Sequence, residues 1–128
     1  MSTESKVKIY KTTVRPILTY AAETRADTSK TKQLLLTTEM NTLRTIVGKT
    51  RRDRIRNVDV RKECCQIQDI VKFAKKRRKE WNEHITRAND DSLIKIARDC
   101  KPEGKRYPGR PRKRWLQSWV STSTESTT

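Results

Sequence analysis

The sequence lacks long apolar runs and contains few large apolar side chains. No more than three apolar residues follow one another, so we expect no membrane-spanning segment and no signal peptide. Leucine, isoleucine, valine and phenylalanine contribute 7, 9, 7 and 1 residues, or 24 of 128 together. That share lies near the level at which a highly charged chain no longer folds. We therefore expect a thin hydrophobic core.

Histidine and cysteine are also scarce, which limits the chemistry open to the chain. It has three cysteines, Cys64, Cys65 and Cys100, and one histidine, His84, which is expected to pack near Trp81. An odd number of cysteines forms no closed disulfide framework, so we expect reduced thiols, in keeping with the intracellular protein that the missing membrane span and signal peptide predict. Adjacent cysteines on a helix point about 100° apart and lack the spacing of structural zinc ligands. We expect no metal site and no cofactor.

Catalytic groupings are missing from the sequence as well. One histidine does not define a Ser/His/Asp arrangement by spacing. Asp53, Asp59 and Asp69 lie in a basic region and are expected to form local ion pairs. They do not resemble the converging carboxylates of a two-metal nucleotidyl-transfer site. The sequence therefore predicts no complete catalytic site in this chain.

Positive charge is what the sequence has in excess. Lysine and arginine number 31 against 15 aspartates and glutamates, which leaves a net charge of +16. Residues 44–79 hold fourteen basic side chains against four acidic ones, and residues 101–115 hold seven against one. Cations that neutralise phosphates release condensed counterions. Nucleic acid is therefore the expected partner, a membrane is not, and the nucleus is the expected location.

Apolar residues recur every three or four positions along most of the chain, which predicts an all-α fold, a small helical bundle. The first helical pattern covers residues 7–21, and Pro16 is expected to kink or split it. The clearest pattern begins at a cap at Ser29 and covers residues 29–47. Gly48 follows at the position of a left-handed C-cap.

Three further helices are expected after this point. Asn57 is predicted to cap a short helix, residues 67–85 carry a single apolar stripe, and Asp90 or Asp91 is predicted to cap a helix that ends near Cys100. The prolines and glycines that follow predict an extended basic segment. The resulting division is a thumb-like helical segment at 1–49, a basic helical segment at 50–100, a Gly/Pro-rich segment with a short tryptophan helix at 101–120, and a disordered tail at 121–128.

Three groups of cations are the candidate phosphate contacts. They lie in the connector before the short helix, on the basic helix, and in the Gly/Pro-rich segment. Their members are Arg51, Arg52, Arg54 and Arg56; Lys75, Lys76, Arg77, Arg78 and Lys79; and Lys105, Arg106, Arg110, Arg112, Lys113 and Arg114. The Gly109-Arg110-Pro111 core is also typical of hooks that lie in an A·T minor groove, although Pro108 stands where an arginine usually precedes it.

Four blocks of sequence carry a family resemblance. They are residues 8–24, with Arg15-Pro16-Ile17-Leu18-Thr19-Tyr20; residues 39–57, with Ile46-Val47-Gly48; residues 76–87, with Trp81-Asn82-Glu83-His84; and residues 104–115, with Gly109-Arg110-Pro111. In this order they resemble the region after the polymerase core in reverse transcriptases of non-LTR retrotransposons, and the resemblance covers residues 6–116. It implies thumb-like helices and a basic tail, with the polymerase aspartates and the endonuclease upstream. Arg25 departs from the pattern, because a tryptophan usually follows the Glu-Thr pair.

Charge and resemblance together predict a nucleic-acid-binding C-terminal fragment of a retrotransposon reverse transcriptase. It would grip template–primer or RNA by phosphate contacts, and the upstream polymerase domain of the parent protein is a second expected partner. Two alternatives stay open. One is a helical protein-interaction module that pairs through the stripe at 67–85, and the other is an A·T minor-groove module that uses the Gly-Arg-Pro core.

Overall fold

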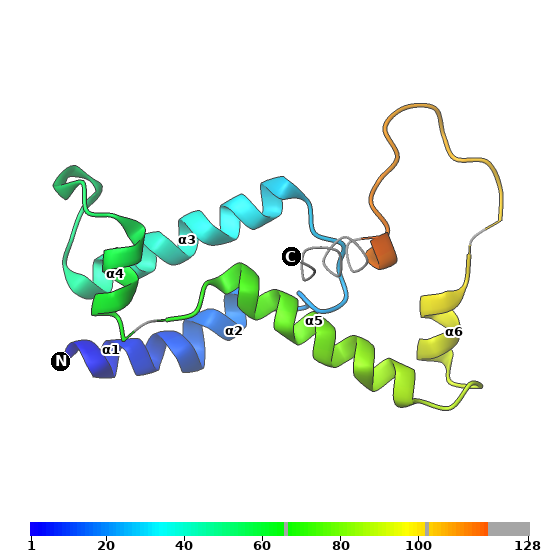
Figure 1. Ribbon diagram of the computed structural model, residues 1–128, viewed down its shortest axis with the longest axis horizontal. Helices are drawn as coiled ribbons and strands as arrows, with labels where there is room; N and C mark the ends of the chain where they lie inside the picture. The colour runs from blue at the N-terminus through cyan, green and yellow to red at the C-terminus, as the bar shows by residue number, and fades with distance from the viewer. Residues whose placement is uncertain (66, 102, 118–128) are drawn as a thin grey trace, which may run out of the picture.

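The computed structural model describes residues 1–65, 67–101 and 103–117 (Figure 1). Its α-helices are α1 (Thr3–Ile9), α2 (Arg15–Leu18), α3 (Ser29–Val47), α4 (Asn57–Glu63), α5 (Ile70–Arg87) and α6 (Leu93–Asp99). No strand occurs in these three ranges, and the predicted all-α fold is confirmed. Residues 115–117 are also helical. The rest of the predicted tryptophan helix and the predicted disordered tail lie outside the described residues.

The N-terminal helical pattern is continuous through its proline. α1 passes into a π-helical turn at Tyr10–Val14, and this turn passes into α2, whose first turn holds Pro16. Proline lacks an N–H and its ring crowds the carbonyl four residues back. A wider turn just before it is a recognised way to absorb this conflict inside a helix. The predicted kink near this point therefore takes the form of a π bulge.

α3 packs against α1, α4 and α5. Thr28, one residue before the predicted cap, accepts a hydrogen bond of 3.2 Å from the backbone N–H of Thr31. At the other end Gly48 adopts φ 75°, which confirms the predicted left-handed cap. The apolar period of this segment predicts Leu36, Met40, Leu43 and Val47 as its inward positions. The buried positions of α3 are Leu35, Glu39, Met40 and Leu43, so the inward face begins one residue earlier than predicted.

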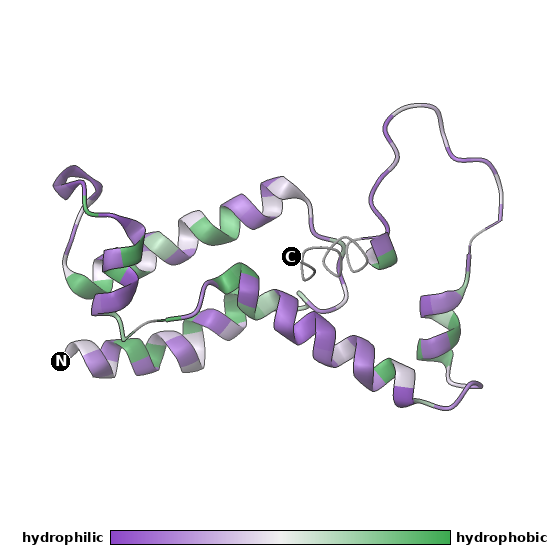
Figure 2. Cartoon of the chain, viewed as in Figure 1, coloured by the Kyte–Doolittle hydropathy of each residue, from purple (hydrophilic) through white to green (hydrophobic). Residues whose placement is uncertain are grey.

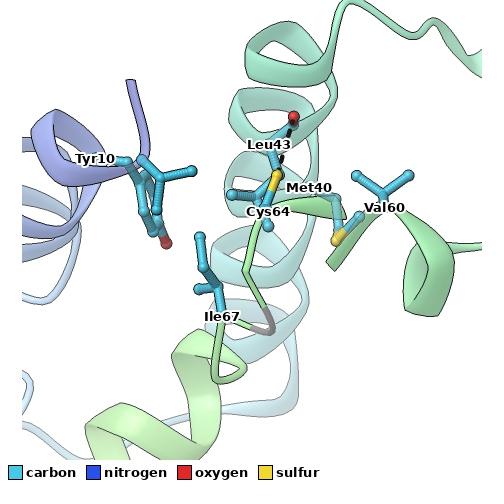
Figure 3. Packing of buried hydrophobic residues seen from close by; sticks show 7 residues of the cluster. Tyr10, Met40, Leu43, Val60, Cys64 and Ile67 are labelled. Atoms are coloured by element: carbon cyan, nitrogen blue, oxygen red, sulfur yellow. Dashed lines mark hydrogen bonds between the residues drawn. The ribbon is translucent and has the colours of Figure 1, made fainter. Parts of the chain in front are cut away.

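The main hydrophobic cluster joins the N-terminal helix, α3, α4 and the segment before α5 (Figure 3). Its members are Val7, Tyr10, Met40, Leu43, Val60, Cys64 and Ile67. Burial of this apolar surface is the driving force for packing, at roughly 25 cal/mol per Å². Hydrophilic residues predominate along α5, whereas hydrophobic and hydrophilic residues alternate along α1 and α3 (Figure 2).

α5 begins three residues later than its apolar stripe predicts. Asp69 caps it by accepting a hydrogen bond of 2.7 Å from the backbone N–H of Val71. The positions of α5 that the fold buries are Ile70, Ala74, Arg78 and Ile85. Most of the stripe therefore faces the protein's own core. α6 has 7 residues, against 18 in α5. Its N-cap is Ser92 instead of Asp90 or Asp91, the two predicted caps, and its first residue, Leu93, is exposed.

The packing of Cys64 makes a prediction about thiol reactivity. Its side chain is buried under α3, and burial raises the pKa of the Cys64 thiol, whereas Cys65 and Cys100 are exposed. Because the thiolate is the reactive form, we expect an alkylating reagent to modify Cys65 and Cys100 in the folded protein and Cys64 only after unfolding. Mass spectrometry of the digested protein measures this, and equal labelling of all three thiols would contradict the packing.

Candidate nucleic-acid interface

The basic connector between α3 and α4 is an ordered loop built around Arg44. The guanidinium of Arg44 donates hydrogen bonds of 3.3 Å to the carbonyl of Thr50 and 2.8 Å to that of Ile55. It also donates a bond of 2.9 Å to Oδ1 of Asn57. Arg44 thus ties the two ends of the loop together. It uses its charge within the loop, and the other cations of the loop lie at the surface.

A short 3-10 turn at Arg51–Asp53 lies inside the connector. Asp53 accepts a hydrogen bond of 2.6 Å from the backbone N–H of Thr50, and this bond holds the pKa of the Asp53 carboxyl below its usual value. Arg54 adopts φ 51°, a left-handed conformation that is uncommon outside glycine. The four predicted contacts of this group, Arg51, Arg52, Arg54 and Arg56, are all exposed.

The basic face of α5 presents fewer cations than the sequence predicts. Lys76, Arg77 and Lys79 are exposed and Lys75 is half-buried. Arg77 donates a hydrogen bond of 3.1 Å to a carboxylate oxygen of Glu23.

Arg78 is the clear difference between sequence and structure. Its side chain is 3% exposed and forms an ion pair of 2.7 Å with Asp27, which is itself buried. It also donates hydrogen bonds to the backbone carbonyls of Ala22, at 2.9 Å, and Arg25, at 3.3 Å. Arg78 thus ties the segment before α3 to α5 and does not belong to the accessible basic surface. Arg78 lies on the predicted stripe at 67–85, in line with Ala74 and Ile85, but it was also predicted as a phosphate contact because its neighbours in the chain are cations.

The Gly/Pro-rich segment is a loop whose two ends are fixed. It leaves α6, arches away from the helices and returns at Trp115 (Figure 1). There the indole N–H of Trp115 donates a hydrogen bond of 2.7 Å to the backbone carbonyl of Glu23. The loop contains no helix or strand in its described part, as predicted, and its cations Lys105, Arg106, Arg110, Arg112, Lys113 and Arg114 are exposed.

The structure therefore divides the predicted contacts into two places. Glu23 connects the cations of α5 with those of the Gly/Pro-rich loop. Its carboxylate accepts a hydrogen bond from Arg77 of α5, and its backbone carbonyl accepts one from Trp115 at the end of the loop. The connector between α3 and α4 lies toward the opposite end of the long axis (Figure 1). We call the surface formed by α5 and residues 103–115 the basic arm.

A buried carboxylate organises the helices under these surfaces, and the sequence analysis missed it. Glu39 of α3 is fully buried and accepts hydrogen bonds from the Tyr10 hydroxyl at 2.7 Å, from Arg61 at 2.5 Å and from the backbone N–H of Ile70 at 3.2 Å. Arg15 lies 3.8 Å from Oε1 of Glu39, the oxygen that accepts the bond from Tyr10, whereas Arg61 and Ile70 donate to Oε2. Glu39 thus connects the N-terminal helix, α4 and the first turn of α5. The available signal was a glutamate directly before Met40 and four residues before Leu43, beside the apolar positions of α3.

Tyr10 makes the Glu39 cluster sensitive to alkaline pH. Burial and then the hydrogen bond to Glu39 raise the pKa of Tyr10 from its ordinary value of 10.0 to about 12. The unfolded chain therefore releases this proton first, so the stabilisation is complete below pH 10 and is lost as the pH rises through about 12. We expect tyrosinate absorbance to show a transition near pH 12 that Tyr10→Phe removes. Identical titration curves for the two proteins would contradict this placement.

The described residues hold no group of three or more histidine, cysteine, aspartate or glutamate side chains that could bind a metal ion. His84 instead stacks on Trp81, with ring centroids 5.5 Å apart and an interplanar angle of 27°, as a packing role predicts. None of the helices in the described ranges is both long enough and apolar enough to cross a membrane.

Comparison with known proteins gives one informative similarity. Over 118 residues the chain is 30% identical to an uncharacterized transposon-derived protein of Caenorhabditis elegans. The aligned region is 88% of this chain and 42% of that protein, so the chain spans less than half of its relative's length. No protein-family model and no solved structure matches the chain.

Proposed function

We propose that this chain is transposon-derived, that it corresponds to the C-terminal region of a retrotransposon reverse transcriptase, and that it binds nucleic acid through phosphates. The transposon-derived relative supports the origin. The four sequence blocks described above support the more specific assignment to reverse transcriptases. The upstream polymerase domain of the parent protein is the proposed protein partner, and the nucleus is the proposed location.

The observation that carries the binding proposal is the set of cations in the loop of the basic arm. All six are exposed, and none forms an ion pair with another described residue. The net charge of +16 adds a long-range attraction for polyanions. A surface of this kind recognises a phosphate backbone without reading base edges.

The two anchored ends of the loop favour binding as well. α6 precedes the loop, and the indole of Trp115 fixes its end at Glu23. A loop whose ends are already held loses less conformational entropy when it closes on a ligand. The helices thus act as a scaffold that presents an extended cationic segment to template–primer or RNA.

Fluorescence anisotropy with single-stranded RNA, duplex DNA and an RNA–DNA hybrid, each across a salt series, tests the proposal. We expect binding with little sequence preference that weakens steeply as salt rises, because counterions are released from each neutralised phosphate. Absent binding, or binding that is insensitive to salt, would overturn the proposal.

The Gly-Arg-Pro core supports a second candidate function, binding in an A·T minor groove. Arg110 and its neighbours are exposed on a loop without helix or strand, so their side chains are accessible to a minor groove. A preference for A·T duplex over RNA that disappears in Arg110→Ala would favour this candidate. The protein-interaction alternative has less surface to use, because Ile67, Ile70, Ala74 and Ile85 of its stripe are buried in the protein's own fold.

A further inference from the structure

A surface groove beside the basic arm gathers aromatic side chains. The groove has a volume of about 600 Å³ and lies between the end of α2 and α5. The chain has three tryptophans, three tyrosines and one phenylalanine, and three of these seven side chains line this one groove. They are Tyr20, Phe73 and Trp81. Three aromatic side chains in one groove of a protein that has few of them offer a binding surface to a ligand with a flat apolar face.

The three rings are not equally available to a ligand. Phe73 is covered by the guanidinium of Arg15, 4.8 Å from the ring centre, and Trp81 stacks on His84. Tyr20 is 82% exposed, and its ring has no aromatic or cationic partner among the described residues. Tyr20 is therefore the ring on which a ligand can stack.

One cation, Arg77, borders the groove on the side of α5, next to Glu23. Arg77 lines it, and its guanidinium is held in place by Glu23 at 3.1 Å. The groove shares Thr24 and Trp81 with a second groove of about 590 Å³, which is also lined by Arg114 and Trp115 at the end of the basic loop. A phosphate backbone that follows the basic arm therefore passes next to Tyr20.

We propose that Tyr20 stacks on one unpaired base of a bound single strand while Arg77 contacts a neighbouring phosphate. The inference rests on the proposed nucleic-acid binding and specifies the class of ligand as single-stranded RNA or DNA. Stacked aromatic platforms beside cationic grooves are typical of proteins that bind single strands. A base inside a duplex is covered on both faces by its neighbours, so a duplex cannot occupy the groove in this way.

The test compares four ligands by anisotropy with the full chain: a 12-nucleotide RNA strand, the matching DNA strand, the same DNA backbone with every base replaced by an abasic site, and duplex DNA. We expect Tyr20→Ala to weaken binding of both intact strands by about 5- to 100-fold. Binding of the abasic strand and of the duplex should change less than about twofold, because phosphate contacts remain. Tyr20→Phe keeps the ring and should bind like the unmodified protein.

Ile17→Ala is the matched control, because Ile17 lies one turn before Tyr20, is 70% exposed and does not line the groove. It should leave all four affinities unchanged. Equal losses for intact and abasic strands in Tyr20→Ala, or no loss at all, would overturn the stacking site while leaving phosphate binding intact. If the unmodified protein binds none of the four ligands, the proposed function itself fails.

Discussion

Replacing Glu39 with alanine is expected to lower the free energy of unfolding by about 3–5 kcal/mol. The substitution removes the acceptor for Tyr10, Arg61 and the first turn of α5, and leaves the side chains of Arg15 and Arg61 without their buried counter-charge. An uncompensated buried charge costs far more than a lost surface ion pair. Since a domain with a thin core has a small margin of stability, this variant should be largely unfolded at room temperature.

Urea denaturation followed by circular dichroism measures this effect. Glu80→Ala makes the same chemical change at an exposed position of α5, where no ion pair involves Glu80 in the described structure. It should alter the free energy of unfolding by less than about 0.5 kcal/mol. If the two variants had the same midpoint, Glu39 would not be the link between the helices.

Neutralising the loop of the basic arm is expected to have the largest effect on binding. Changing Arg106, Arg110, Arg112 and Lys113 to glutamine removes four exposed charges. Each phosphate contact on duplex DNA contributes about 0.9 to the slope of log affinity against log salt. The slope should therefore become shallower by about 3 to 4 if each side chain contacts one phosphate, and affinity at low salt should fall steeply.

A variant with the same loss of charge elsewhere separates local contact from net charge. Lys6, Lys8, Lys11 and Lys30 are exposed on the N-terminal helical segments and at the start of α3. Their replacement by glutamine should change the slope by less than about 1, because these side chains lie outside the basic arm. Equal changes in the two variants would mean that the total charge, and not the loop, determines binding.

Features that depend on near neighbours in the chain were predictable. Periodic apolar residues gave α3 and α5 to within a few residues, and Gly48 ends α3 because a left-handed C-cap favours a residue without Cβ. The Gly/Pro-rich segment is extended for an equally local reason. Pro16 was predicted to disturb its helix, but the π turn that absorbs it required the packing of Tyr10 to be known.

Features that depend on distant partners required the tertiary structure. The pairs Tyr10–Glu39, Arg61–Glu39 and Arg78–Asp27 are separated by 29, 22 and 51 residues. The sequence does not distinguish a charged side chain that faces water from one that pairs with a buried partner, because packing alone determines which atoms come into contact. For the same reason Arg78 was counted among the surface cations.

The sequence by itself determined that this protein is helical, strongly cationic and thin in its core, because periodicity, composition and charge are properties of the chain. Only the tertiary structure decided which charged side chains are buried in ion pairs and which are exposed to solvent. It placed Glu39 and Arg78 at the joints between helices, tied the basic loop to α5 through Glu23, and left Tyr20 exposed beside it. The exposure of a side chain, and its contacts with residues that are distant in the sequence, are determined only when the helices pack.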